Sequence, residues 1–197
     1  MDNKLLDTLI GLLLIVCGAY LSVTFVMPQE EVPPHQHLDV VEQDRQCQLI
    51  NKILEHAMEG MGADRAYLFQ FHNGVHAGDR QFLYYSNTHE VCAPGVSPEI
   101  MGLQRLPLSI LAPTWMPKMA KSKAWYLETA KEKHEQTKKI LEDQGILALM
   151  ISRVQYTGEI IGFVGVDYVR EIPSKPDEKQ LIEAANLIQA VIGGKRG

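Results

Sequence analysis

Four polar side chains stand in segments that otherwise have the composition of buried β-strands. They are Gln70, His72, Ser152 and Asp167. Such groups are typical of a ligand-binding site, but they equally fit groups that only hydrogen-bond one another or the backbone. The sequence leaves both interpretations open. The apolar lining of a cavity beside them would come from Tyr84, Met150 and Phe163.

Catalytic and metal chemistry have little support in the sequence. His72, His76, His89 and Cys92 lie in one short stretch, but their spacing matches no standard metal site, which favours solvated loop residues. No serine, histidine and carboxylate set, glycine-rich phosphate loop or carboxylate pair stands out. We therefore assign no catalytic residue and no metal ligand, and the cofactor is unknown.

Composition excludes one broad class of partner. The 197 residues carry a net charge of -5, with 46% hydrophobic and 22% charged residues. Nucleic-acid binders normally present a basic surface, so DNA and RNA are not expected partners. The three cysteines are far apart and fit no disulfide framework, which favours free thiols in a reducing compartment.

The N-terminal region contains a candidate membrane span. Residues 8–27 form an uncharged run that is long enough to cross a bilayer, and no small-x-small cleavage site follows it. We predict that residues 1–27 are a retained anchor in the inner or plasma membrane, with the domain facing the cytoplasm. Gly18 and Ser22, four residues apart, would let two such helices approach closely, although small residues are common in membrane spans. We expect a homodimer that uses mainly the predicted helices 38–61 and 177–192 of the domain.

The remaining chain divides into three parts. The proline-rich residues 28–38 predict an extended linker. Residues 39–192 contain the alternating and helical patterns of one folded domain, and residues 193–197 form a glycine-rich tail that we expect to be flexible.

Within the domain, hydrophobic periodicity predicts an α+β arrangement. The expected helices are 38–61, 115–121, 129–144 and 177–192, and the expected strands are 64–74, 82–86, 124–127, 146–155 and 159–169. Residues 87–111 contain several prolines and are expected to be irregular.

The two strands joined by Thr157-Gly158 predict a β-hairpin whose faces can be sorted if that pair is a two-residue loop. A bulky face would pack on helices, and it carries Leu147, Leu149, Ile151, Ile160, Val164 and Val166. A gapped face would leave room for a ligand, and it carries Ala148, Met150, Ser152, Phe163, Gly165 and Asp167. A register slip of one residue would exchange the faces of one strand.

The same argument divides the first strand into two faces. Tyr67, Phe69 and Phe71 are expected in the core that packs on helices. Gln70 and His72 are expected on the gapped side, together with Asp167.

The order of these elements resembles that of a GAF domain. The resemblance is carried by the return strand Gly158-Glu159-Ile160-Ile161-Gly162-Phe163-Val164-Gly165-Val166 and by the closing helix with Leu181, Ala185 and Ile188. Residues 65–74 also look like the first strand of small uncharacterised GAF-like proteins of bacteria and phages. The resemblance implies an antiparallel sheet flanked by helices, here preceded by one N-terminal transmembrane helix.

Several functions are compatible with that resemblance, because GAF domains bind ligands from cyclic nucleotides to tetrapyrroles and amino-acid-like molecules. The chain has no Asn-Lys-x-Asp-Glu-type cyclic-nucleotide signature. The leading hypothesis is a non-enzymatic, membrane-anchored sensory module that binds an unknown small molecule and signals through a partner or by oligomerisation. The alternatives are a scaffold without a ligand and, since some GAF-fold proteins are thiol-dependent methionine sulfoxide reductases, an enzyme that uses Cys92.

Overall fold

In a computed structural model of the chain, the structure describes residues 40–73, 82–111, 113–174 and 176–193. The predicted anchor, the linker and most of the C-terminal tail lie outside these residues. Among the helices of the described ranges, none has the length and apolar content that a membrane span requires.

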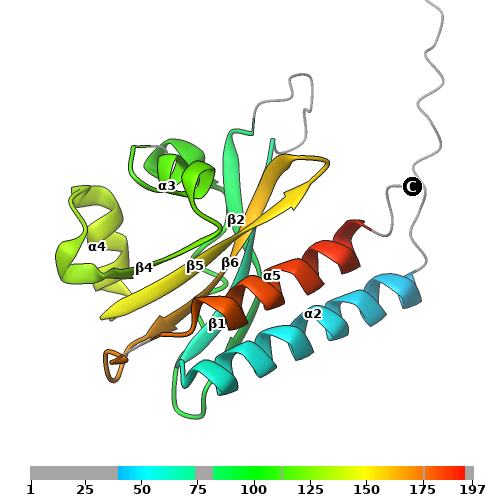
Figure 1. Ribbon diagram of the computed structural model, residues 1–197, viewed down its shortest axis with the longest axis horizontal. Coiled ribbons are helices and arrows are strands. Elements are labelled where there is room, and N and C mark those ends of the chain that lie inside the picture. The colour runs from blue at the N-terminus through cyan, green and yellow to red at the C-terminus, as the bar shows by residue number, and fades with distance from the viewer. Residues whose placement is uncertain (1–39, 74–81, 112, 175, 194–197) are drawn as a thin grey trace, which may run out of the picture. The chain divides into compact units, whose positions relative to one another are not determined.

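The domain is built on a six-stranded antiparallel sheet with the strand order β3-β2-β1-β6-β5-β4 (Figure 1). The strands are β1 (Arg65–His72), β2 (Tyr84–Cys92), β3 (Leu106–Pro107), β4 (Ala124–Glu128), β5 (Ala148–Tyr156) and β6 (Glu159–Tyr168). Strand β1 is central, and it pairs with β2 on one side and with β6 on the other. The predicted antiparallel sheet is therefore confirmed.

Helices cover both faces of the sheet. One face is covered by α2 (Val40–Met61) and α5 (Glu178–Gly193), which run side by side in Figure 1. The other is covered by η1 (Leu108–Ile110), α3 (Trp115–Lys121), η2 (Thr129–Lys131) and α4 (Glu135–Asp143). The predicted α+β class, with a sheet between helices, is confirmed.

The face under α2 and α5 is aliphatic. Helix α2 buries Ile50, Leu54 and Met58, which follow one another four residues apart and so form one stripe. They pack with Leu68 of β1 and Leu181 of α5, both of which are fully buried. We call this layer the aliphatic layer.

The opposite face is aromatic. Tyr67, Phe69 and Phe71 alternate along β1 and pack with Trp115 of α3 and Phe163 of β6. The rings of Phe69 and Phe163 stack with their centroids 4.9 Å apart. The expectation that these three β1 residues belong to a core packed on helices is confirmed, and we call this layer the aromatic layer.

The hairpin between β5 and β6 has the predicted turn but not the predicted register. Thr157 and Gly158 both have positive φ, at 48° and 86°, as a two-residue hairpin loop requires. Close to the turn, Gln155 pairs with Ile160, but Val154 pairs with Gly162, so Ile161 has no partner in β5. This one-residue bulge exchanges the faces of the rest of β6.

The bulge corrects the predicted faces. Val164 and Val166 lie in the aliphatic layer with Met150, whereas we predicted them beside Leu149 and Ile151. Phe163 lies in the aromatic layer, and Asp167 shares its side of the sheet because it pairs with Leu149. The predicted gapped face therefore does not exist as one surface.

Strand β2 extends through the first part of the segment that we predicted to be irregular. It runs to Cys92, although residues 86–90 are polar. The prediction failed because cross-strand pairing, rather than side-chain hydrophobicity, holds this segment in the sheet: Asn87 pairs with Phe69 and Glu90 with Tyr67.

The predicted helix 129–144 is interrupted. Its middle is extended at Glu132, whose Oε1 atom accepts hydrogen bonds from the backbone N–H groups of Lys133 and His134 at 2.7 and 2.9 Å. Its Oε2 atom accepts one from Trp115 Nε1 at 2.9 Å. These bonds satisfy the chain where the helix stops, so α4 starts only at Glu135.

Candidate functional site

A cavity of about 40 Å³ lies in the aromatic layer, between the sheet and the helices that cover it. Its sheet side is formed by Tyr67, Phe69, Tyr85, Glu90, Phe163 and Asp167. Its helix side includes Leu111 and Trp115, three residues of α4 (Thr137, Ile140 and Leu141) and Gln144, which follows α4. The cavity thus combines aromatic walls with carboxylate groups.

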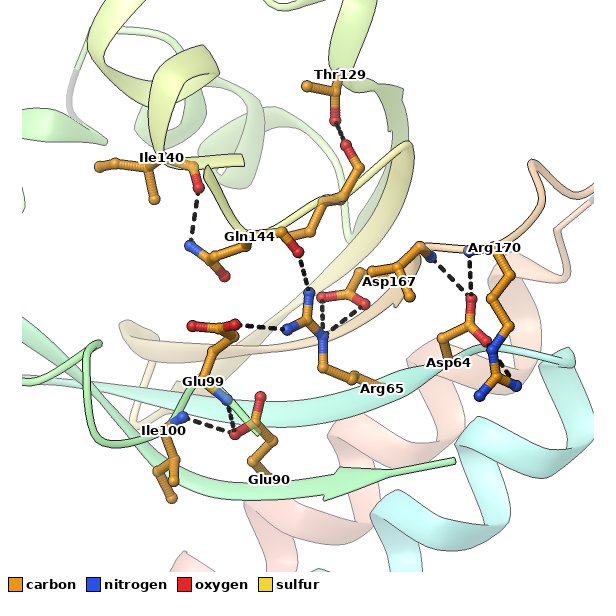
Figure 2. Close-up of polar contacts among 12 residues, drawn as sticks. Asp64, Arg65, Glu90, Glu99, Ile100, Thr129, Ile140, Gln144, Asp167 and Arg170 are labelled. Atoms are coloured by element: carbon orange, nitrogen blue, oxygen red, sulfur yellow. Dashed lines mark hydrogen bonds and ion pairs between the residues drawn. The ribbon is translucent and has the colours of Figure 1, made fainter. Parts of the chain in front are cut away.

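The polar end of the cavity is organised by a buried ion pair between β1 and β6. Arg65 and Asp167 pair across the two strands, and each residue is only 1% exposed. Arg65 Nε donates to both carboxylate oxygens of Asp167, at 3.0 and 3.1 Å (Figure 2). A buried pair of this kind persists because each charge compensates the other.

Arg65 also connects this ion pair to two further segments. Its Nη2 atom donates to the backbone carbonyl of Gln144, the residue that ends α4, at 3.2 Å. Its Nη1 atom lies 3.6 Å from Glu99 Oε1, in the segment between β2 and β3. One guanidinium group therefore connects β1 to three other parts of the fold, as Figure 2 shows.

Glu90 of β2 contributes a second carboxylate to the cavity. Its Oε2 atom accepts hydrogen bonds from the backbone N–H groups of Glu99 and Ile100, at 2.8 and 2.7 Å. Within the described part of the chain, its Oε1 atom has no hydrogen-bond donor. This atom is free to accept a hydrogen bond from a ligand.

Burial changes the protonation of this cluster. Burial raises the pKa of Asp167 to about 7, although Arg65 pulls it in the opposite direction. Burial also raises the pKa of Glu90, against the lowering effect of its two backbone hydrogen bonds. Burial alone would lower the pKa of Arg65, but the Asp167 carboxylate outweighs it and raises the pKa, so the guanidinium stays charged.

Tyr67 lies over a glycine beside these charges. A side chain at Gly165 would collide with the Tyr67 ring, so the glycine creates the space that the phenol occupies. Burial, reinforced by the Asp167 charge, raises the pKa of Tyr67 well above its usual value. Tyr67 and Tyr85 are only 6% and 4% exposed, and neither hydroxyl has a hydrogen-bond partner among the residues that the structure describes.

The structure separates the seven residues that we predicted as a site. Asp167 and Phe163 line the cavity. Five others lie on the opposite side of the sheet, and they are Gln70, His72, Tyr84, Met150 and Ser152. The correction has two causes, because the bulge reverses β6 and because Gln70 and His72 alternate with the cavity residues of β1.

Four of these five residues have structural contacts where they lie. His72 Nε2 is 2.8 Å from Ser86 Oγ, and its ring is stacked with Tyr84 at 6.0 Å. Ser152 Oγ donates to the Lys123 carbonyl at 3.2 Å, and Met150 is fully buried in the aliphatic layer. These contacts agree with the alternative that polar residues in buried strands only satisfy one another or the backbone.

Sequence reasoning missed Arg65, Glu90 and Tyr67 as cavity residues. Glu90 falls in the segment predicted to be irregular, and Tyr67 was assigned only to the core. Arg65 stands directly across from Asp167. With the bulge placed correctly, two opposite charges facing each other in buried strands would have identified the ion pair.

Metal and thiol chemistry find no support among the described residues. They contain no group of three or more His, Cys, Asp or Glu side chains that could hold a metal ion, and His76 lies outside them. Burial raises the pKa of Cys92 to about 11, so its thiol is protonated at neutral pH. A reductase needs a reactive thiolate, which this environment disfavours.

Solved structures similar to this chain are GAF domains. The blue-light absorbing form of the Thermosynechococcus elongatus PixJ GAF domain is 13% identical, covers 78% of this chain and 86% of its own, and has a TM-score of 0.60. The phycocyanobilin-bound GAF domain from a cyanobacterial phytochrome is 12% identical, covers 79% and 91%, and has a TM-score of 0.61. The corresponding phycoerythrobilin-bound domain is 12% identical, covers 78% and 88%, and also has a TM-score of 0.61.

The sequence itself has no comparable matches. No protein-family model matches it. A search of curated proteins finds no similar sequence. The structural likeness shows that the described domain has a GAF-like fold, as the order of its elements implied.

Proposed function

We propose that this GAF-like fold is a sensory module that binds a small molecule in the cavity of its aromatic layer. The observation that carries the proposal is the cavity itself, whose aromatic walls include Tyr67 and Tyr85 and which is bordered by Glu90, whose Oε1 atom has no donor in the described chain. Buried polar groups are normally hydrogen-bonded, so these groups are suited to a ligand or to ordered water. Two of the similar GAF domains are bilin-bound, which supports a binding role for the fold.

The cavity suggests how binding would be transmitted. Arg65 joins β1 and β6 to the end of α4 and to Glu99, so a ligand at Asp167 would act on all four segments. A ligand that binds one arrangement of these contacts more tightly shifts the population toward that arrangement. The signal would then pass to a partner or change oligomerisation.

We also propose that the module is held at the inner or plasma membrane by residues 8–27 as a homodimer, with its domain in the cytoplasm. The support is the uncharged N-terminal run and the Gly18 and Ser22 pair within it. Membrane fractionation of the full chain and of Leu13→Arg tests the anchor, because an arginine near the centre of the span opposes insertion. Recovery of the unaltered chain in the soluble fraction would refute it.

Ligand binding is tested by filling the cavity. The full chain is screened by thermal shift against small molecules, and each compound that raises the melting temperature is retested on Ile110→Trp, which places a larger side chain at a half-buried position of the cavity wall. Ile172→Trp is the matched control, because Ile172 is 44% exposed and does not line the cavity. We expect binding to be lost only in Ile110→Trp.

Two outcomes would contradict the proposal. If no compound stabilises the chain, the scaffold alternative is favoured. If Ile110→Trp and the unaltered chain bind alike, the ligand occupies another site.

A further inference from the structure

The walls of the cavity have the chemistry that attracts cations. Tyr67, Phe69, Tyr85 and Phe163 line it from the sheet, and Trp115 lines it from α3. Trp115 and Phe163 meet edge to face with centroids 6.1 Å apart. The faces of aromatic rings carry partial negative charge and bind ammonium groups, most strongly where water is excluded.

The charged groups at the polar end of the cavity also favour a cation. Glu90, Glu99 and Asp167 place three carboxyl groups around one guanidinium, that of Arg65. Both Asp167 and Glu90 line the cavity directly, and Glu90 Oε1 is without a donor in the described chain. An anionic ligand would meet an excess of carboxyl groups here, whereas a cation would compensate it.

Two neutral groups add acceptors for a donor-rich ligand. The hydroxyls of Tyr67 and Tyr85 are unpartnered among the described residues, in side chains that are more than nine-tenths buried. Neither hydroxyl oxygen is fully shielded from water, so each can hydrogen-bond to water or to a ligand in the cavity. They are independent of the carboxyl groups, and they border the same cavity.

The size of the cavity limits the ligand. One water needs roughly 10–15 Å³ of such space, so about 40 Å³ holds about three waters or an organic molecule of a few non-hydrogen atoms. A tetrapyrrole is far larger and does not fit the cavity in this form.

We propose that the cavity selects a small organic cation, an alkylammonium ion, which donates hydrogen bonds to Glu90 Oε1 and the tyrosine hydroxyls and packs its alkyl group against Phe163 and Trp115. This inference rests on the proposed function, because it names the ligand class of the same cavity.

The experiment compares three organic probes of similar size and different charge, with sodium chloride as the control for ionic strength. The full chain is titrated with ethylammonium chloride, ethanol, sodium acetate and sodium chloride at matched ionic strength. Binding is followed by NMR chemical shifts and by the fluorescence of the neighbouring Trp115 and Trp125, of which Trp115 lines the cavity. We expect saturable binding of ethylammonium at least about tenfold tighter than that of ethanol, since losing one partner of a desolvated charge pair weakens binding by that order or more. Acetate and sodium chloride should show no saturable binding.

Two variants locate the binding site. Glu90→Gln keeps the shape of the side chain but removes its charge, and Tyr67→Phe removes only a hydroxyl. Each should weaken ethylammonium binding, whereas Glu142→Gln, which alters an exposed carboxylate of α4, should not. Binding that is unaffected in both Glu90→Gln and Tyr67→Phe would overturn the proposal.

The failure of this inference is distinguishable from failure of the proposed function. If ethanol or acetate binds as tightly as ethylammonium, and Ile110→Trp abolishes that binding, the cavity binds a ligand of another class. If ethylammonium does not bind while the wider screen finds a ligand that Ile110→Trp excludes, only the cation proposal is refuted. If no compound binds, both proposals are refuted.

Discussion

The two layers of the domain are stabilised by different physical means. The aliphatic layer under α2 and α5 contains residues such as Leu54, Leu68 and Leu181, whose apolar side chains are fully buried. The aromatic layer contains a cavity, a buried ion pair and hydroxyls without partners in the described chain. The first arrangement serves stability, whereas the second combines a cavity with ionisable groups, as ligand-binding sites do.

From this comparison we expect the largest loss of stability on substitution at Arg65, in the buried ion pair. At about pH 8, where Asp167 is ionised, Arg65→Met leaves its carboxylate buried without a partner, and we expect the free energy of unfolding, measured by urea denaturation, to fall by about 4 kcal/mol. Arg170→Met is the matched control, because Arg170 is half exposed and its partner Asp64 keeps two backbone hydrogen bonds, so its ion pair should contribute less than about 1 kcal/mol. Equal losses in the two variants would show that burial of the pair is not decisive.

The aliphatic layer should respond to lost volume rather than lost charge. Leu54→Ala removes a fully buried side chain, and we expect a loss of about 3 kcal/mol in unfolding free energy with ligand affinity unchanged. Leu187→Ala, at a position of α5 that is 50% exposed, should cost less than about 0.5 kcal/mol. A change in ligand affinity in Leu54→Ala would contradict the separation of the two layers.

Asp167 predicts a dependence of stability on pH. Its pKa is about 7 in the folded protein and 3.8 in an unperturbed side chain, so between these values the folded state retains a proton that the unfolded state has lost. The stabilisation from this proton is complete below about pH 4 and is lost as the pH rises through about 7. Between pH 5 and 8, the unfolding free energy of the unaltered chain, measured by urea denaturation, should therefore fall with pH more steeply than that of Asp167→Asn. Equal pH dependence in the two proteins would refute this prediction.

The smallest effect on stability is expected at Tyr67. Tyr67→Phe removes a buried hydroxyl that has no partner in the described chain, so the unfolding free energy should stay within about 0.5 kcal/mol or rise slightly. Urea denaturation measures this directly. A loss above about 1 kcal/mol would show that the hydroxyl has a structural hydrogen bond.

Most of the fold could be predicted from periodicity. The stripe of Ile50, Leu54 and Met58, the alternation of Tyr67, Phe69 and Phe71, and the Thr157-Gly158 turn each report a local preference that the folded structure keeps. Local patterns of this kind identify an element and its buried side whenever one face is apolar.

Periodicity predicts the candidate site less well than the fold, because the site depends on strand register and on cross-strand neighbours. Asp167 and Phe163 were identified, but a bulge at Ile161 separated them from Met150 and Ser152. Arg65 and Glu90 are buried by partners distant in the sequence, and nothing in their own segments indicates those partners. Side-chain chemistry alone therefore could not assemble the cavity.

The bulge at Ile161 takes up one residue of chain length within β6. Because Ile161 has no partner in β5, its deletion would leave the pairs Val154–Gly162 and Leu149–Asp167 in place, and Asp167 would stay on the side of the aromatic layer. Deleting a residue beyond the bulge, such as Val164, would instead turn Asp167 toward α2 and α5. A library of single-residue deletions along β6 should therefore show that the loss of Ile161 is tolerated far better than the loss of a residue that is paired beyond the bulge.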